Sequence, residues 1–420
     1  MISGPREWTW RDSGNHGLLV RSFNILSRGL GYANRRFVPD QLMERAACKT
    51  GLDDFGEPGF REGLELVCRS FSADRQLTGL GQLFGRQMIT GTLMNRLQVI
   101  DWCKTHPEVE QEVIRQPWAI TGLIRTGTTL SSALFDLDAR VRTPLAWEVD
   151  SPVPPPLLTT RHSDPRIAQS ARQLALLNKL APPMQAIHPM EACYPQECVV
   201  LTQLDFHSIL FQAVSMAPEY MDWYTSSKKF SAYRLHKKIL QMWQSAIPTI
   251  HWGSKAPNHM HGIDALMETY PDARVVWCHR DPLVCIPSVL SLSATFLKPF
   301  TRRLDAQQLG EIVNRHWLAG VQNMMAYDQS QTDRSWCHHL YYQDLVSDPA
   351  MTLRKAYQHF DDEVDELHER KIRMWVQQRP QGVFGVHKYS LGDFGFDAAS
   401  LREQYADYID RYQVPVECRA

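Results

Sequence analysis

The sequence predicts an α/β fold: a P-loop-like three-layer sandwich with a central parallel sheet, together with a helical N-terminal region and a helical insert. In the second part of the chain, short β-type runs alternate with helical patterns, which implies crossover connections and a sheet covered by helices on both faces. The first of these runs ends in a glycine-containing loop that precedes a helix, an arrangement that binds phosphate. These two observations carry the fold prediction.

Length and charge narrow the class of protein. A chain of 420 residues is too long for one compact core. We therefore expect one large domain with an added helical region, or two domains. The helical N-terminal cap region is placed at residues 1–114 and the α/β domain at residues 115–420, with its insert at about 160–247. The formal net charge is −1, so no global field attracts nucleic acid, and any anion site must be built locally.

Cysteine usage and hydropathy indicate the compartment. The nine cysteines are scattered and form no C-x-x-C pair, which argues against a secreted disulfide framework. The first residues carry charges without a continuous apolar stretch, so no signal peptide is expected. No run of about 18 apolar residues occurs, so we expect no membrane span. The sequence thus predicts a cytoplasmic protein.

Helical patterns dominate the N-terminal region, at residues 17–30, 39–51 and 57–74. The first of these is amphipathic and carries Arg21 and Arg28. Such a helix could rest on a membrane surface, but packing against the core is the preferred expectation. We interpret the region as a cap or an oligomerisation element, and whether the protein is a homo-oligomer stays open.

Four short β-type runs follow, each with a helical pattern after it: residues 117–122, 249–255, 273–279 and 336–342. Ligands of open parallel sheets bind beyond the carboxyl ends of the strands. Three cationic residues fall at those ends, namely Arg125, Lys255 and Arg280.

Between the first two runs lies the predicted insert. The segment at residues 148–158 contains four prolines and cannot be regular structure. Helical patterns follow at about 166–181, 195–213 and 228–246. Such an insert commonly shapes a substrate pocket.

The loop after the first run has the frame of a phosphate-binding loop without its lysine. Gly122 and Gly127 are separated by four residues, but Thr128 stands where a nucleotide triphosphatase has Lys, and the loop carries Arg125 instead. No strand ending in Asp completes a magnesium site, and no His, Cys or Asp cluster has metal-ligand spacing, so no metal is expected. A ligand with a single 5′ phosphate needs neither. The alternative is a turn that only joins strand to helix.

A second candidate anion site follows the third run. Arg280 ends the strand, Asp281 can cap the next helix and Pro282 suits its first position. Ser288 lies eight residues beyond Arg280, on that helix, and the two side chains could hold a second phosphate from two sides. An Arg–Asp surface pair with a buried serine is the alternative.

Four motifs occur in one order: "GLIRTGTTL", "RTPLAWEVDSPVPPP", "SKAPNH" and "HRDPLVCIPSV". Together they resemble the PAPS-dependent sulfotransferase family, in particular a bacterial branch with "GLPRTGTT", "KSPGH" and "HRDP…PSV", over about residues 115–412. The chain departs from this pattern at Ile124, where Pro is usual, and at Ala256, where Ser is usual. We expect a less rigid loop and the loss of one hydroxyl contact.

The resemblance implies a reaction and a donor. Sulfuryl transfer from PAPS (3′-phosphoadenosine 5′-phosphosulfate) to a hydroxyl or amine of a small-molecule acceptor gives 3′,5′-adenosine bisphosphate and needs no metal. Implied for the 5′ phosphate are Arg125, Thr126, Gly127, Thr128 and Thr129, and implied for adenine is Tyr342. Implied for the 3′ phosphate are Arg280 and Ser288, together with Lys388 and, more weakly, His387 in a late loop at residues 382–397 that resembles the loop closing over this phosphate.

Catalytic roles follow from the same resemblance. Glu148 is the first candidate for the base that takes the acceptor's proton, and His259 is the second. Lys255 is expected to bridge the sulfuryl and leaving oxygens, and Arg125 to neutralise the leaving phosphate. The structural alternatives are an exposed glutamate, a core histidine and a solvated lysine.

Other functions stay open from the sequence. The same loop serves small-molecule kinases that use ATP, and a non-catalytic nucleotide-binding protein could keep the fold. Aromatic and methionine residues of the insert suggest an apolar acceptor pocket but are equally typical of a helical core. Glu191 and Glu197 could line that pocket, although surface positions are the preferred expectation.

Overall fold

The computed structural model describes residues 7–14, 17–188, 190–379 and 386–417. At its centre is a five-stranded parallel sheet in the order β3-β4-β2-β5-β6. Its strands, in that order, are Val141–Arg142, His251–Lys255, Trp118–Gly122, Arg274–His279 and Cys337–Tyr341. All four strands expected from the sequence are present. The added edge strand β3 is too short to show a pattern.

Strand register brings the predicted site together. Ile120 of β2 lies opposite Lys255 of β4, and Gly122 of β2 lies opposite Cys278 of β5. The carboxyl ends of these three neighbouring strands therefore meet at one edge of the sheet. The glycine-containing loop, Lys255 and Arg280 all leave the sheet there, as predicted.

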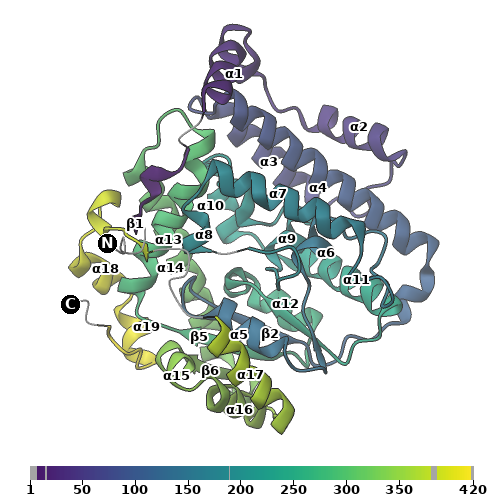
Figure 1. Ribbon diagram of the computed structural model, residues 1–420, viewed down its shortest axis with the longest axis vertical. Coiled ribbons are helices and arrows are strands. Elements are labelled where there is room, and N and C mark those ends of the chain that lie inside the picture. Colours follow the sequence, from purple (N-terminus) through teal and green to yellow (C-terminus); the bar gives the residue numbers. More distant parts are fainter. Residues whose placement is uncertain (1–6, 15–16, 189, 380–385, 418–420) are drawn as a thin grey trace.

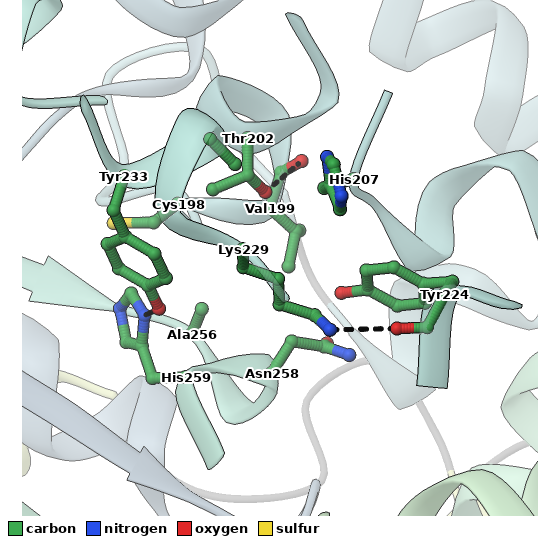
Figure 2. Close-up of a pocket in the computed structure, with 11 residues that line it drawn as sticks. Cys198, Val199, Thr202, His207, Tyr224, Lys229, Tyr233, Ala256, Asn258 and His259 are labelled. Atoms are coloured by element: carbon green, nitrogen blue, oxygen red, sulfur yellow. Dashed lines mark hydrogen bonds between the residues drawn. The ribbon is translucent and has the colours of Figure 1, made fainter. Parts of the chain in front are cut away.

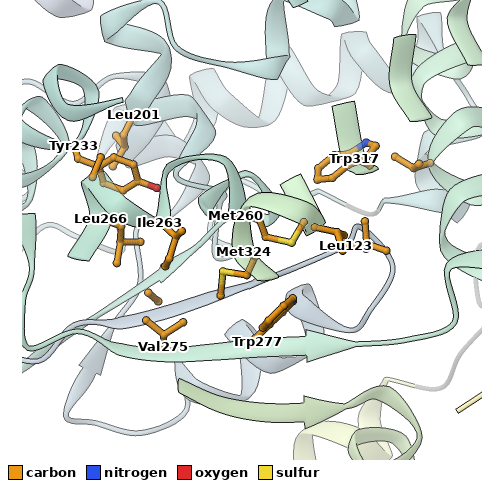
Figure 3. Close-up of a cluster of buried hydrophobic side chains, with 14 of the residues drawn as sticks. Leu123, Leu201, Tyr233, Met260, Ile263, Leu266, Val275, Trp277, Trp317 and Met324 are labelled. Atoms are coloured by element: carbon orange, nitrogen blue, oxygen red, sulfur yellow. The ribbon is translucent and has the colours of Figure 1, made fainter. Parts of the chain in front are cut away.

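Helices cover both faces of the sheet (Figure 1). Val275 and Trp277 of β5 point to one face, into a core shared with α11 to α14 and α19. Val276 and Cys278 point to the other face, into a core shared with α5 and α15 to α17. Figure 3 shows part of the first core, with Val275 and Trp277 beside Met324. The structure is thus the three-layer sandwich that the sequence predicts.

The helices around the sheet follow its strands in sequence. They are α5 Thr128–Phe135, α6 Ala146–Asp150, α12 Ile263–Thr269, α13 Pro282–Leu297, α14 Ala306–Ser330, α15 Tyr342–Ser347, α16 Pro349–His359, α17 Glu366–Gln378, α18 Ala398–Gln404 and α19 Ala406–Arg411. One segment, Pro282–Phe300, is long and apolar enough to cross a membrane, contrary to the sequence-based expectation. Most of it is buried inside the protein, which is typical of a core helix.

The N-terminal helices share a hydrophobic core with the insert. They are α1 Leu18–Gly29, α2 Pro39–Thr50, α3 Phe60–Ala73 and α4 Gly79–Thr105. Buried side chains of α2 to α4 share one core with Phe206, Phe211 and Tyr220 of the insert. The boundary expected near residue 114 therefore does not separate two hydrophobic cores.

The first described residues join the opposite end of the chain. Strand β1, Glu7–Trp8, pairs in parallel with β7, Val386–His387. Trp10 then packs into the core on the α13 side of the sheet, beside Phe394. Residues 7–14 thus belong structurally to the α/β domain and not to the helical cap.

The insert is helical but more broken than the sequence predicts. It contains α7 Pro165–Leu180, α8 Met184–Ile187, α9 Val199–Thr202, α10 Pro218–Ser226 and α11 Phe230–Ala246. The single helix expected at 195–213 is wrong. Phe206 adopts a left-handed φ of 57° and is fully buried against the N-terminal helices, which ends the helix. The adjacent Asp205 is fixed by a buried ion pair with Arg96 of α4.

Candidate functional site

The loop between β2 and α5 is pressed against its neighbours. Gly127 has a φ of 91°, and a Cβ there would lie 2.7 Å from Leu345 and 3.2 Å from the Tyr342 ring. Gly122 has a φ of 138°, and a Cβ there would clash with the carbonyl oxygen of Cys278. Both positions require glycine, because its backbone freedom and lack of Cβ let the loop close over β5 and α15. The N-terminus of α5, with its unpaired backbone N–H groups, points at the ligand position that this loop would hold.

Arg125 stands at the apex of the loop. Its φ of 76° is left-handed, which costs a non-glycine residue roughly 1–2 kcal/mol. The side chain is exposed, and Nη1 donates to the carbonyl oxygen of Ile187 on α8 at 2.7 Å. Strained residues of this kind cluster at functional sites. Through its hydrogen bond to Ile187, Arg125 connects the loop to the insert, and its exposed side chain remains accessible to a ligand.

Ile124 contributes to the rigidity of the loop. It packs in a small apolar cluster with Ile187 and Met184 of α8 and Leu292 of α13. The contact occupies the position where the related motif has proline. The sequence predicts a less rigid loop because the proline ring is missing. The apolar contact of Ile124 opposes this loss of rigidity.

The three threonines of the loop have different surroundings. Thr126 is buried and its Oγ1 donates to the carbonyl oxygen of Leu123 at 2.7 Å, which stabilises the loop itself. Thr128 is also buried. Thr129 is partly exposed, and its Oγ1 accepts a long hydrogen bond from Lys255 Nζ at 3.5 Å. Thr129 is the threonine whose side chain contacts another predicted site residue.

Lys255 brings a glutamate into the site. Its Nζ donates to Glu197 Oε1 at 2.8 Å, and its side chain is only 1% exposed. The backbone N–H of Cys198 donates to the Lys255 carbonyl at 2.9 Å, which fixes the segment that carries Glu197 beside the end of β4. The surface position expected for Glu197 is therefore wrong, because its side chain is 18% exposed and paired.

The charges around Glu197 favour its ionised form. Burial alone would raise the pKa of this carboxyl, but Lys255 and His188 together hold its pKa below the ordinary value. His188, at the end of α8, shares the electrostatic environment of Glu197, Lys255 and Arg125. Burial and the two cations lower the pKa of His188 to about 4, so its imidazole is neutral at neutral pH. Nothing in the sequence around His188 indicated this position.

Arg280 connects three parts of the site. Its Nη1 donates to the carbonyl oxygen of Arg125 at 2.9 Å, and its guanidinium lies 3.7 Å from the centre of the Tyr342 ring. Nε and Nη2 donate to the two carboxylate oxygens of Glu417 at 2.7 and 3.0 Å. The guanidinium therefore holds an anion in the forked geometry that also suits phosphate. The structure brings Arg280, Tyr342 and the loop together, as the motifs imply.

The remaining residues implied for the 3′ phosphate lie in two different places. Ser288 is buried on α13, and His387 bonds through Nε2 to Ser291 Oγ at 3.2 Å, one turn further on the same helix. Lys388 is exposed, and its Nζ pairs with Glu7 of β1 at 2.6 Å. His387 thus lies near Ser288, whereas Lys388 is directed to the N-terminal strand. Part of the late loop, residues 382–385, lies outside the described residues.

Glu148 has contacts that fit a structural carboxylate. Its side chain is fully buried, and Oε1 accepts from Arg142 and Arg161, each at 3.2 Å. Oε2 accepts the backbone N–H of Leu145 at 2.9 Å, at the start of α6. Three donors therefore occupy the carboxylate. It is neither the exposed loop residue considered from the sequence nor a carboxylate open to an acceptor.

The position of the Glu148 cluster also separates it from Lys255. Arg142 lies over the ring of Trp252, near the start of β4, at 4.6 Å. Lys255 stands three residues later on that strand, roughly 10 Å along it at about 3.3 Å per residue. Glu148 therefore belongs to the early part of β4, and the loop to its end.

His259 lines an interior pocket on the insert side of β4 (Figure 2). Its Nδ1 lies 2.6 Å from the Tyr233 hydroxyl, and its Nε2 is buried without a hydrogen-bond partner among the described residues. Burial lowers the pKa of His259 to about 3, so the ring is neutral. Figure 2 shows Lys229 in the same pocket, where burial lowers its pKa to about 7. No hydrogen bond within the described part of the chain joins His259 to Lys255 or to the loop.

A model of the sulfotransferase family matches residues 117–366, more than half of the chain. The chain belongs to the sulfotransferase family. The matched range begins just before β2 and includes the loop, Lys255, Arg280 and Tyr342.

Solved sulfotransferases have the same architecture. The structure resembles STF9 from Mycobacterium avium with a TM-score of 0.83 and 27% sequence identity, over 91% of this chain and 98% of the other. It resembles STF1 from Mycobacterium tuberculosis with a TM-score of 0.79 and 28% identity, over 89% of this chain and all of the other. Both matches thus span most of this chain and nearly the full length of the solved sulfotransferases.

A curated relative matches over a shorter range. It is the omega-hydroxy-beta-dihydromenaquinone-9 sulfotransferase Stf3 of Mycobacterium bovis and Mycobacterium tuberculosis, 24% identical over 164 residues. The match spans 38% of this chain and 40% of that relative.

The arrangement of this sulfotransferase can hold an anion at two linked places. Arg125 and the N-terminus of α5 form one place, Arg280 with Tyr342 forms the other, and the hydrogen bond from Arg280 to the Arg125 carbonyl joins them. Lys255 and Glu197 lie next to Thr129 at the first place. No three His, Cys, Asp or Glu side chains gather as a metal site in the described ranges.

Proposed function

We propose that this sulfotransferase transfers the sulfuryl group of PAPS to a hydroxyl or amine of a small, apolar acceptor and releases 3′,5′-adenosine bisphosphate. The observation that carries the proposal is the set of contacts made by Arg280. Its guanidinium donates two hydrogen bonds to the Glu417 carboxylate and lies over the Tyr342 ring. It also donates a hydrogen bond to the Arg125 carbonyl in the loop between β2 and α5. A ligand that is anionic at two ends and carries an aromatic base between them fits this arrangement.

The residues present fit the donor. The Glu417 carboxylate stands where the proposed 3′ phosphate would bind Arg280, so that phosphate would exchange for the carboxylate. Tyr342 offers an aromatic face beside the loop glycine, which suits a stacked adenine. Ser288 and His387 lie on or against the same stretch of α13 and complete the proposed 3′ end.

In the proposed reaction, the acceptor oxygen or nitrogen forms a bond to sulfur while the bond from sulfur to the bridging phosphate oxygen breaks. The electron pair of the broken bond goes to the 5′ phosphate, where negative charge develops. Arg125, Lys255 and the backbone N–H groups at the start of α5 lie around the loop that would hold this phosphate. Preorganised cations and dipoles of this kind stabilise developing charge without reorganisation.

The acceptor's proton needs a base, and we propose Glu197 for that role in place of Glu148. The Glu197 carboxylate is ionised, lies 2.8 Å from Lys255 Nζ and belongs to the same edge of the sheet as the loop. Lys255 would keep it oriented until the acceptor binds. Glu148 is saturated by two arginines and a backbone N–H, which leaves it a positioning role for α6.

An apolar acceptor is supported by the side chains around Arg125. The apolar cluster of Ile124, Met184, Ile187, Leu292 and Phe296 flanks the loop on the insert side. The curated relative is named for the acceptor omega-hydroxy-beta-dihydromenaquinone-9, which also supports a hydroxylated acceptor. A cytoplasmic location is part of the proposal as well, because the eight cysteines of the described residues are all free thiols.

Turnover with labelled PAPS tests the proposal. The purified chain is incubated with PAPS and a panel of phenolic, steroidal and prenylated alcohols, with EDTA present, and products are read by mass spectrometry. The expected result is an acceptor heavier by one SO₃ together with an equal amount of 3′,5′-adenosine bisphosphate. Activity that instead requires ATP and magnesium would overturn the proposal in favour of a kinase. Binding of the bisphosphate without turnover of any acceptor would favour a non-catalytic protein.

A further inference from the structure

Helix α1 exposes its apolar side chains. Five large apolar side chains are between 63% and 89% exposed, which leaves little of their surface packed against the protein: Leu18, Leu19, Ile25, Leu26 and Leu30. At 100° per residue these side chains share one broad face of the helix, and the partly exposed Phe23 borders it. Figure 1 shows α1 at one extremity of the molecule, at the end opposite α16 and α17.

The face that α1 turns to the protein is mostly polar, and of its apolar side chains Val20 packs against the core of α2 to α4. Asn24 Oδ1 accepts the backbone N–H of Leu80 at 2.9 Å, and Ser27 is buried against Gly79 of α4. A surface helix of a globular protein normally buries its apolar stripe and exposes its polar face. Helix α1 does the reverse, so the expectation that it packs its apolar face into the core is wrong. Its orientation indicates a partner that lies outside the chain.

The charge around α1 is of one sign. The sequence from residue 13 to residue 39 contains Arg21, Arg28, Arg35 and Arg36 and no Asp or Glu, although the whole chain has a net charge of −1. All four arginines are exposed. Arg21 and Arg28 are seven residues apart and so lie on the same side of the helix, beside the apolar face. An apolar face bordered by arginines matches the chemistry of an anionic lipid surface.

We propose that α1 docks the protein onto anionic membranes, with its apolar face in the headgroup and acyl boundary and its arginines on lipid phosphates. A second copy of the chain fits the same face less well. In a two-fold contact the arginines of both copies would meet, and no carboxylate in this segment could pair with them. The docking does not rest on the proposed donor or acceptor. Its consequence, delivery of the enzyme to acceptors dissolved in a membrane, does rest on the proposed function.

Vesicle co-sedimentation tests the docking with the full chain. Vesicles of phosphatidylcholine alone are compared with vesicles that also contain phosphatidylglycerol. The expected result is binding to the anionic vesicles, weakened by added salt. The triple variant Leu19→Ser, Ile25→Ser, Leu26→Ser should lower the partition coefficient at least about tenfold, since three exposed apolar side chains no longer insert. Its melting temperature should be unchanged, since these side chains make no core contacts.

A matched control changes exposed apolar residues at the other end of the molecule. The double variant Leu367→Ser, Met374→Ser on α17 replaces side chains that are 49% and 51% exposed and should bind vesicles like the parent chain. The variant Arg21→Gln, Arg28→Gln should lose several-fold of the binding to anionic vesicles, because each basic residue near the surface contributes to it.

Three results would overturn the inference. The first is no binding to either vesicle type, and the second is an equal loss in the α17 control. The third is a concentration-dependent dimer that the triple α1 variant abolishes, which would assign the face to a second copy of the chain. Turnover of a water-soluble acceptor should be unchanged in the α1 variant, so a failure of docking and a failure of the proposed reaction are read separately.

Discussion

At the residue scale, the Lys255–Glu197 pair is the contact on which the proposed chemistry depends. The two side chains are 2.8 Å apart and mostly buried, and Lys255 also reaches Thr129 of the loop. Sequence reasoning identified Lys255 from its place at a strand end. It named Glu197 only as a possible pocket residue and preferred a surface position, because the hydrogen bond that fixes this residue joins backbone atoms of the distant segments around Cys198 and Lys255.

Replacing Glu197 by Gln removes the proposed base and keeps the shape of the side chain. The expected result is a kcat at least about 100-fold lower with nucleotide binding retained, which is the usual contribution of a general base. Steady-state kinetics and calorimetry measure the two quantities. Glu191→Gln, on the exposed part of the same segment, is the control and should remain active. Full turnover of the Glu197 variant would return the base role to the other candidates, Glu148 and His259.

Glu417 is predicted to compete with the donor. Its carboxylate holds Arg280 through two hydrogen bonds, at 2.7 and 3.0 Å. The variant Glu417→Gln should therefore bind 3′,5′-adenosine bisphosphate several-fold more tightly, because the phosphate no longer displaces a charge-assisted pair. Titration calorimetry measures the affinity, and Glu403→Gln, an exposed carboxylate on α18, is the control. Unchanged or weaker binding would show that Glu417 does not oppose the nucleotide.

At the element scale, the sequence predicted the parts whose pattern is local. The four longer strands have short β-type runs, and three of them, β2, β4 and β5, end where a glycine, lysine or arginine leaves the sheet. The break in the helix at residues 195–213 could not be predicted from the local pattern. It depends on Phe206 packing against helices that lie more than a hundred residues earlier in the sequence. The exposed face of α1 escaped for a related reason, since an amphipathic pattern does not say which face meets the protein.

The contact between α4 and the broken segment of the insert gives a stability prediction. Arg96 and Asp205 are 2.9 Å apart and nearly fully buried, and Arg96 also donates to the backbone carbonyls of Phe55, Glu57 and Leu204. Arg96→Met removes the arginine from the buried carboxylate, which keeps Ser231 and His207 as side-chain partners, and should lower the free energy of unfolding by about 3 kcal/mol. Urea denaturation measures this quantity.

The control for this prediction is an ion pair on the surface of the same region. Arg69 and Glu219 are 3.1 Å apart but 61% and 49% exposed, so Arg69→Met should cost less than about 1 kcal/mol. Equal effects of the two variants would mean that the buried pair does not fix the insert to the N-terminal helices.

At the scale of the whole molecule, the N-terminal helices and the insert form one core, which the sequence could not show. The division at residue 114 followed a change of pattern from helices to alternating elements. That change is real, but domains are defined by cores, and buried apolar side chains between residues 206 and 224 share one core with those of α2 to α4. The short strand pair β1 and β7 likewise joins two ends of the chain without a pattern that reveals their pairing.

Buried histidines predict how stability depends on pH. Burial lowers the pKa of His236 to about 4 and the pKa values of His259 and His316 to about 3, against an ordinary value of 6.5. Below about pH 6.5 the unfolded chain binds protons that the folded chain does not, so stability is full above this pH and falls as the pH drops towards 4. Each histidine should contribute about 1.4 kcal/mol per pH unit in that window.

Urea unfolding at a series of pH values measures this slope. His236→Gln should reduce the slope of unfolding free energy against pH by the contribution of one histidine. His162→Gln, at an exposed position, should leave the slope unchanged. A stability that stays constant from neutral pH to about pH 4 would show that the three imidazoles are protonated in the folded protein, contrary to their buried surroundings.

The central claim is that a single nucleotide with phosphates at its 5′ and 3′ ends bridges the loop of residues 123–127 and Arg280. Calorimetric titration of the full chain with 3′,5′-adenosine bisphosphate, with 5′-AMP and with magnesium ATP tests it most directly. The bisphosphate should bind at least about tenfold more tightly than 5′-AMP, and Arg280→Gln should remove this difference, because a charge-assisted bidentate contact is lost. Clean binding of magnesium ATP with no heat from the bisphosphate would contradict it.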